Sequence, residues 1–267
     1  MTLKRPAHPL LQPYVVQFWY HVPRNLAAAG VEYILPDGTM HITLREHQPL
    51  ELYESSLTLG RANLSGIHTR YYAKINRPSA CLGCQLRPAS TRALFGIPAD
   101  QLVNCHLSLA ELWPRSEVDG IVDRVIATPN PNQKLDIFES FLLDRLRPIE
   151  IPELLAFSLG FLAQGQPIQA WIAKSGYSHR YMKELFRQWM GVTPKMWQRI
   201  HRLNRVTNKA WSSNRAWSDL ALDAGFSDQA HLTREFREIA GVSPSTFRKY
   251  ASAARHVPFL HEANRKI

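Results

Sequence analysis

Three cysteines and one histidine have a spacing that could hold a metal ion. Cys81 and Cys84 are separated by two residues, and Cys105 and His106 are adjacent. Two thiolates from one segment, with a thiolate and an imidazole from another, form a donor set that zinc accepts. The first two cysteines lie in an expected strand, however, where side chains three residues apart point to opposite faces. We therefore expect neither a metal site nor a cofactor.

The sequence contains none of the familiar short catalytic motifs. We find no nucleophile elbow, no glycine-rich loop of the kind that cradles a phosphate, and no His-Glu-x2-His pair. The sequence therefore predicts a binding protein and not an enzyme.

A repeated pattern places polar and basic side chains at matching positions of two segments. The chain reads GYSHRYMKELFRQWMGVTP from Gly176 and GFSDQAHLTREFREIAGVSP from Gly225. Each copy predicts a helix, a turn and a second helix, because glycine accepts the positive φ that such a turn needs. This is helix-turn-helix geometry, in which the second helix enters the DNA major groove. The expected units are 167–190 and 217–240.

The two turns differ in length by one residue, most simply Ser227. Ser178 and Asp228 then become equivalent, and both are good N-caps for the helices that follow. Tyr177 and Phe226 follow the turn glycines, and we expect each to be a large apolar plug in its unit.

The first turn of each recognition helix, and the outward side of its second turn, should face base edges. Arginine can bind guanine, and glutamine adenine, through two hydrogen bonds. The residues expected at the bases are His179, Arg180, Lys183 and Glu184 in the first unit, and Gln229, Ala230, Thr233 and Arg234, flanked by His231, in the second.

Glu184 is unusual among these residues because its charge repels phosphates. It could accept a hydrogen bond from cytosine N4. It could instead pair with Arg180, four residues earlier on the helix, and we expect this pairing.

Further basic residues, together with the backbone N–H groups at the starts of both recognition helices, are expected to bind phosphate. The alternative for these residues is a surface that only aids solubility. They are Arg187, Lys195, Arg199, Arg237, Arg248 and Lys249.

A helix between the units must set the spacing of the two DNA segments that they read. Met196, Ile200, Leu203 and Val206 recur at spacings of three and four, which predicts one buried helical stripe. A helix of ~16 residues would span roughly 25 Å. We expect a rigid pair of units whose half-sites lie about one DNA turn apart.

The segment DLALDAGFSDQAHLTREFREIAGVSPSTFRKY, from Asp219 to Tyr250, has an A-x3-GF turn, a recognition helix and a G-x-[ST]-P-x2-[FY]-R ending. Residues from about 150 to 250 thereby resemble the DNA-binding region of AraC/XylS transcriptional regulators. The first copy of the pattern is looser, as is usual in that family. The resemblance implies sequence-specific DNA binding, and RNA polymerase as a partner if the protein is an activator.

The N-terminal part is similar to a domain of unknown function found ahead of such regions in bacterial regulators. The similarity lies in HPLLQPYV, LPDG, LGRA, CQLRPASTRALFGIP and LAELW. Some AraC-type regions are instead fused to DNA-alkylation repair domains that use cysteines as zinc ligands and methyl acceptor. Only three cysteines, and no motif of that domain, argue against this enzyme alternative.

Residues 9 to about 88 predict mostly strands. Asp37-Gly38 is a strong hairpin-turn signal between two apolar runs. Residues 80–86 alternate, with Leu82, Cys84 and Leu86 on one face. Five aromatic residues could line an effector pocket, although ordinary core packing explains them more simply: Tyr14, Phe18, Trp19, Tyr20 and Tyr33.

Charge is distributed unevenly over the chain. The net charge is +10, and residues 1–147 hold 15 Lys and Arg against 13 Asp and Glu, whereas residues 148–267 hold 17 against 9. A basic C-terminal part suggests a polyanion partner. Three cysteines fit a reducing cytoplasm. The start of the chain predicts no signal peptide, and the longest apolar run is too short to span a membrane.

The predicted fold class is α+β. We expect a β-rich, barrel-like or sandwich regulatory domain with helices at 1–147, then a linker with two prolines. An all-α DNA-binding domain at 150–255 should follow, with a linker helix joining its two units. The expected partners are double-stranded DNA, RNA polymerase for an activator, and a small-molecule effector or a second copy at the N-terminal domain. The expected function is a cytoplasmic transcription activator controlled through that domain; a repair-coupled regulator and a basic protein-interaction module are the alternatives.

Overall fold

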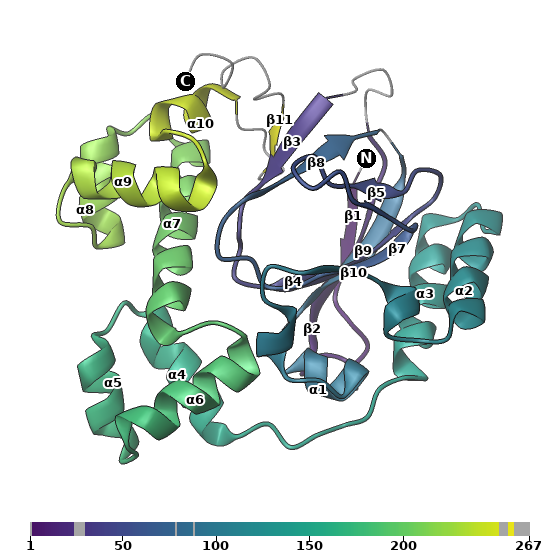
Figure 1. Cartoon of the computed structure of the whole chain (residues 1–267), viewed down its shortest axis with the longest axis horizontal. Coiled ribbons are helices and arrows are strands. Elements are labelled where there is room, and N and C mark those ends of the chain that lie inside the picture. Colours follow the sequence, from purple (N-terminus) through teal and green to yellow (C-terminus); the bar gives the residue numbers. More distant parts are fainter. Residues whose placement is uncertain (1, 24–29, 78, 88, 251–255, 259–267) are drawn as a thin grey trace.

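The computed structural model describes residues 2–23, 30–77, 79–87, 89–250 and 256–258 of the chain. Figure 1 shows a β-rich N-terminal half beside a helical C-terminal half. All but one of the described strands lie in the first 108 residues, and the long helices follow them, so the predicted α+β class is confirmed. Among the described helices, none combines the length and the apolar character that crossing a membrane requires.

A six-stranded antiparallel sheet is the framework of the N-terminal half. In its inner strand β9, Leu82, Cys84 and Leu86 are buried on one face, as their alternation predicts, and Cys81 lies on the other. The strands, in their order across the sheet, are β1 (Thr2–Arg5), β2 (Val15–His21), β9 (Cys81–Leu86), β4 (Met40–Arg45), β7 (Ala62–Ser65) and β10 (His106–Ser108).

The predicted hairpin around Asp37-Gly38 is wrong. The strand before this turn pairs in a second sheet, whereas β4 after it pairs with β7 and β9. Gly38 has φ of +80°, so the turn signal is real, but it marks a corner between two sheets. The strands outside the main sheet are β3 (Gly30–Ile34), β8 (Tyr72–Asn76) and β11 (His256–Pro258), in the order β11-β3-β8, and the pair β5 (Leu50–Glu51) and β6 (Thr58–Leu59).

The N-terminal half also contains helices that follow the strands of its main sheet. Helix α3 buries Leu135, Phe138 and Leu142, which share one face because they are spaced by three and four residues. Phe138 packs edge-on against Phe18 of β2, with ring centroids 5.6 Å apart. The helices are α1 (Ser90–Phe95), η1 (Ala99–Leu102), η2 (Leu109–Glu111), α2 (Arg115–Ala127) and α3 (Pro131–Leu143).

Two helix-turn-helix units make up most of the C-terminal half. Both turn glycines are left-handed, with φ of +72° at Gly176 and +85° at Gly225. The side chains of Ser178 and Asp228 accept backbone N–H groups of the following helices, so both predicted N-caps are confirmed. The helices are α4 (Glu153–Ala163), α5 (Ile168–Ser175), α6 (His179–Met190), α7 (Pro194–Ser212), α8 (Trp217–Ala224), α9 (Gln229–Ala240) and α10 (Pro244–Tyr250).

The two halves are packed together, not merely tethered. One buried apolar cluster runs from Phe18 of the main sheet to Trp171 and Phe186 of the first unit. A second cluster joins Tyr33 and the β3–β8 sheet to α7, α8 and α9. The segment that connects the two halves is also bonded to the N-terminal half, because the backbone of Ile149 forms two hydrogen bonds with the hydroxyl of Tyr14. The aromatic residues considered for an effector pocket therefore serve core packing, with Tyr14, Phe18, Tyr20 and Tyr33 buried and Trp19 partly exposed.

Candidate DNA-binding surface

Helix α7 runs between the two units and holds both (Figure 1). Its predicted stripe is confirmed: Ile200, Leu203 and Val206 are fully buried, and Met196 is half-buried. Buried apolar residues on the inner faces of α6 and α9 complete the same cores. The two recognition helices are therefore fixed relative to one continuous helix.

The outward side of α9 is open. Gln229, Ala230, Arg234 and Arg237 are exposed, while the hydroxyl of Thr233 turns back to donate to the backbone oxygen of Gln229 at 2.8 Å. Ala230 leaves space between the longer side chains. The face thus offers an amide, two guanidinium groups and a small residue, which suits contact with base edges and phosphates.

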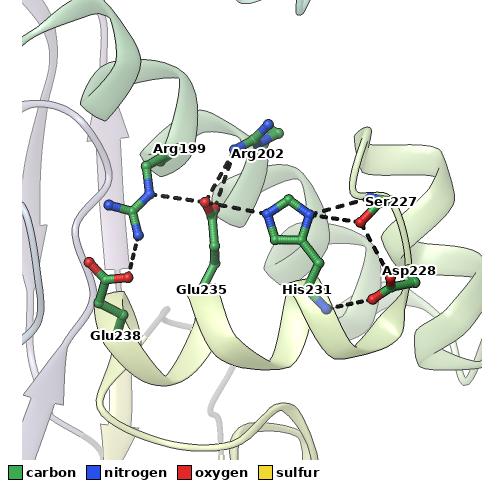
Figure 2. Close-up of polar contacts among 7 residues, drawn as sticks. All are labelled: Arg199, Arg202, Ser227, Asp228, His231, Glu235 and Glu238. Atoms are coloured by element: carbon green, nitrogen blue, oxygen red, sulfur yellow. Dashed lines mark hydrogen bonds and ion pairs between the residues drawn. The ribbon is translucent and has the colours of Figure 1, made fainter.

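A polar network fixes the side of α9 that faces α7 (Figure 2). Arg199 Nε donates to Glu235 Oε1 at 3.0 Å, and Arg202 Nη2 approaches the same carboxylate at 3.3 Å. Arg199 also donates to Glu238 at 2.6 Å. Arg199, an expected phosphate ligand, is 14% exposed and pairs with two carboxylates, so its contact with phosphate stays a prediction.

His231 belongs to the same network. Its Nδ1 accepts from the backbone N–H of Ser227 at 3.4 Å, and its Nε2 lies 3.7 Å from Glu235 Oε1. Figure 2 shows the ring between the turn and the carboxylate, with Asp228 capping the helix beside it. Both ring nitrogens face partners within the protein, so His231 fastens the turn to the recognition helix.

The first recognition helix carries its basic residues near its start. His179, Arg180 and Lys183 are exposed on α6, while Met182 and Phe186 on the opposite side are buried. This places the predicted base-facing side chains of the first unit outward, next to the helix N-terminus, where free backbone N–H groups favour phosphate.

Glu184 pairs forward along α6, not backward with Arg180 as expected. It accepts from Arg187 Nη2 at 2.7 Å and from Gln188 Nε2 at 2.8 Å. These hydrogen bonds, first from Arg187 and then from Gln188, lower the pKa of Glu184 to about 2. The reason is tertiary, since Asp100 of η1 holds the Arg187 guanidinium beside Glu184.

Arg187, another expected phosphate ligand, is likewise paired with carboxylates within the protein. Its guanidinium lies between Asp100 of the N-terminal half and Glu184 of its own helix. Arg92 of α1 adds a second tie, because it donates to Gln188 at 3.3 Å and lies over the ring of Trp189.

The N-terminal half approaches the ends of both recognition helices very closely. A Cβ on Gly191, after α6, would lie 2.9 Å from the backbone oxygen of Ala99, and one on Gly241, after α9, would lie 2.2 Å from the ring of Tyr71. The backbone N–H of Tyr71 donates to the backbone oxygen of Ile239 at 2.6 Å. Only glycine fits these two contacts.

The remaining predicted phosphate ligands lie at the ends of helices. Lys195 and Lys249 are exposed. Arg248 lies over the ring of Trp217, 4.1 Å from its centroid, and donates to the backbone oxygen of Arg215 at 2.8 Å. Arg248 therefore ties α10 to the start of α8.

Comparison with known proteins agrees with this geometry. A family model described as a helix-turn-helix domain matches residues 171–250, and a domain of unknown function (DUF6597) matches residues 4–108. The chain is 31% identical over 86 residues to the probable transcription factor PqrA of Proteus vulgaris, a match that covers 32% of this chain and 70% of PqrA. The chain belongs to the AraC/XylS family.

Other relatives match over a smaller share of their length. The HTH-type transcriptional regulator ExsA of Pseudomonas aeruginosa is 34% identical over 67 residues, which is 25% of this chain and 24% of ExsA. The crystal structure of a single-residue variant of apo ToxT from Vibrio cholerae aligns over 93% of this chain and all of that one, at 10% identity and a TM-score of 0.48. The AraC/XylS assignment makes this protein a transcription regulator with a DNA-binding helix-turn-helix domain.

Two neighbouring tyrosines of this AraC/XylS regulator are exposed at the surface, which the sequence did not predict. Tyr177 is 53% exposed and stacks on Tyr181, which is 49% exposed, so the prediction that Tyr177 is a buried plug is wrong. Phe226, its counterpart, is 3% exposed and confirms the prediction for the second unit. A phenol hydroxyl needs a hydrogen-bond partner when buried, whereas a phenyl ring does not. That hydroxyl, and the spacing of four to Tyr181, were the available sequence signals.

A buried group of histidines lies near the contact with α7. The rings of His68 and His106 stack with centroids 4.5 Å apart, and His201 of α7 lies against Gly38. Burial lowers the pKa of His68 to about 3 and that of His106 to about 4. Burial, and then the nearby charge of Arg205, lower the pKa of His201 to about 4. These imidazoles are therefore neutral at pH 7.

Proposed function

We propose that α6 and α9 enter successive major-groove segments on one face of a DNA duplex and read the sequence there. The main support for this proposal is that both helices have exposed, largely basic outward sides, while their inner sides pack onto α7. The 19 residues of α7 cover about 28 Å, which is near the ~34 Å between successive segments. The base contacts would come chiefly from Arg180, Lys183, Gln229 and Arg234.

The salt dependence of DNA binding tests this proposal. The full chain, titrated against a duplex selected from a random pool, should lose about 10³–10⁵ in affinity between 50 and 200 mM salt. Such a loss corresponds to ~6–10 phosphate contacts, each of which releases counterions. A mobility-shift assay without binding, or with binding that salt leaves unchanged, would sink the proposal.

The N-terminal half, on this proposal, controls the first unit. Asp100 occupies Arg187, and Arg92 holds Gln188 and Trp189, so the C-terminal end of α6 is engaged by the regulatory half. A change in that half, through an effector or a second copy of the chain, would release Arg187 to a phosphate. The released state would bind DNA more tightly and, in an activator, would recruit RNA polymerase.

Asp100→Asn tests this control directly. The variant should raise DNA affinity by roughly two- to tenfold and steepen the salt dependence by about one phosphate contact, because Arg187 becomes available. Asp136→Asn is the matched control, since Asp136 pairs with Arg5 inside the N-terminal half. Equal affinities for Asp100→Asn and the control would argue against the restraint. Transcription assayed with purified RNA polymerase would then give the sign of regulation.

A further inference from the structure

The stacked tyrosines of the first unit have no role in its core. Their ring centroids are 5.0 Å apart with planes inclined by 25°, and about half of each side chain faces solvent. Neither hydroxyl has a hydrogen-bond partner among the residues that the structure describes. Large rings that fill no core and are held in one place by stacking are typical of an interface.

The position of the pair indicates what it would contact. Tyr177 and Tyr181 flank the N-cap Ser178, so both lie at the end of α6 that points toward the groove in our proposed function. The exposed side chains near them on α6 include His179, Arg180 and Lys183, and the exposed carboxylate of Glu184 is paired with Arg187. The surrounding charge is therefore positive, which favours a polyanion over an acidic or apolar protein partner.

The second unit shows that the turn itself does not need such a pair. The equivalent residues are Phe226 and His231, whose rings pack edge to face at 5.3 Å. Phe226 is buried beneath Arg202, and His231 faces partners within the protein with both ring nitrogens. The same two positions thus hold the unit together in one copy and present two hydroxyls in the other.

We propose that Tyr177 and Tyr181 are DNA-contacting residues of the first unit, whose hydroxyls donate to backbone phosphates beside the groove read by α6. Tyrosine is among the side chains that bind phosphate oxygens, and such contacts fix the register of a protein on DNA. Rings that are already stacked lose little conformational freedom on binding. This inference rests on the proposed function.

The double variant Tyr177→Phe, Tyr181→Phe tests it in the full chain. Anisotropy titrations on a duplex selected with the wild type should show affinity lower by about 5- to 50-fold, the loss expected for two hydrogen bonds. The salt slope should stay unchanged, because a neutral hydroxyl releases no counterion. Arg180→Ala should instead flatten the slope by about one. Tyr53→Phe, an exposed tyrosine of the N-terminal half, is the matched control.

Two outcomes separate this inference from the proposed function. A wild type that binds no duplex defeats both, whereas a wild type that binds and a double variant within twofold of it defeat the tyrosine contact alone. Nitration of the wild type by tetranitromethane, read by mass spectrometry, gives a second measurement without any substitution. Duplex DNA should protect Tyr177 and Tyr181 but not Tyr53, and equal nitration with and without DNA would overturn the inference.

Discussion

The two helix-turn-helix units share a backbone design but have different polar attachments. In the second unit, Glu235 bonds α9 to Arg199 and Arg202 of the linker helix. The equivalent position of the first unit is Leu185, which cannot accept a hydrogen bond. The polar ties of α6 run instead from Arg187 to Asp100 in the N-terminal half. Side-chain polar contacts thus tie the second recognition helix to α7 and the first to the N-terminal half. A backbone hydrogen bond from Tyr71 also reaches the end of α9.

This difference separates two kinds of information in the repeated pattern. Some positions are shared by the two copies and determine the backbone conformation. They are the turn glycine, the N-cap and the buried apolar pair, Met182 with Phe186 or Leu232 with Phe236. The positions that differ decide which partner each helix has.

Changing the spacing of the half-sites should have the largest effect. Five base pairs inserted between the half-sites rotate the second major-groove segment to the opposite face of the duplex. One of the two units must then dissociate from the DNA. Affinity should fall by at least about 100-fold, since single mismatches already cost about 1–3 kcal/mol each. The same insertion outside the two half-sites is the control, measured by competition titration. Affinity within twofold of the uninterrupted site would mean that the units are independently tethered.

Acid should weaken the contact between the β-rich half and α7. The pKa values of His68, His106 and His201 are lowered from 6.5 to about 3, 4 and 4 in the folded chain. Between pH 6.5 and about 4 the unfolded chain therefore binds more protons, and the free energy of unfolding falls as pH falls, by at most about 1.4 kcal/mol per pH unit and histidine.

Urea unfolding at several pH values measures this dependence. His68→Phe should flatten it, whereas His8→Gln, which changes an exposed histidine, should leave it as in the wild type. A stability that is constant from pH 7 to pH 4.5 would contradict the burial of neutral imidazoles.

The Glu235 network should matter more for stability than its counterpart on α6. Glu235→Ala leaves two partly buried guanidinium groups without their shared carboxylate, whose side chain is 13% exposed, and should cost roughly 2–3 kcal/mol. Glu184→Ala removes a carboxylate that is 47% exposed and screened by solvent, so it should cost much less stability than Glu235→Ala. Chemical denaturation compares the two variants, and equal losses would remove the distinction between the units.

The most localised expected effect is a change in base preference at single positions. Arg234→Ala should cost about 1–3 kcal/mol at one base position of the second half-site and relax specificity there. Arg237→Ala, one turn further along α9, should weaken binding to all sequences alike. A panel of single-base operator variants distinguishes the two, and matching profiles would mean that the roles are wrongly assigned.

The sequence by itself determined the local structure of the C-terminal half. Helix boundaries, the two N-caps, the turn glycines and the buried stripe of α7 all depend on residues within one or two helical turns, so their patterns are visible in the chain. The alternation of β9, which separates Cys81 from Cys84, is local for the same reason. The outward placement of Arg180 and Arg234 also follows from helical periodicity.

Only the tertiary structure decided which partners these residues meet. Arg199 reaches Glu235 across 36 residues, and Arg187 reaches Asp100 across 87. No local pattern encodes such contacts, because an ion pair depends on where two distant backbones come together. The corner at Asp37-Gly38 is similar: the turn signal fixes φ, but the strands with which β3 and β4 pair lie far away in the sequence. The residues after the two turn glycines also differ in burial, since Tyr177 is exposed and Phe226 is buried, and that difference depends on how each unit packs.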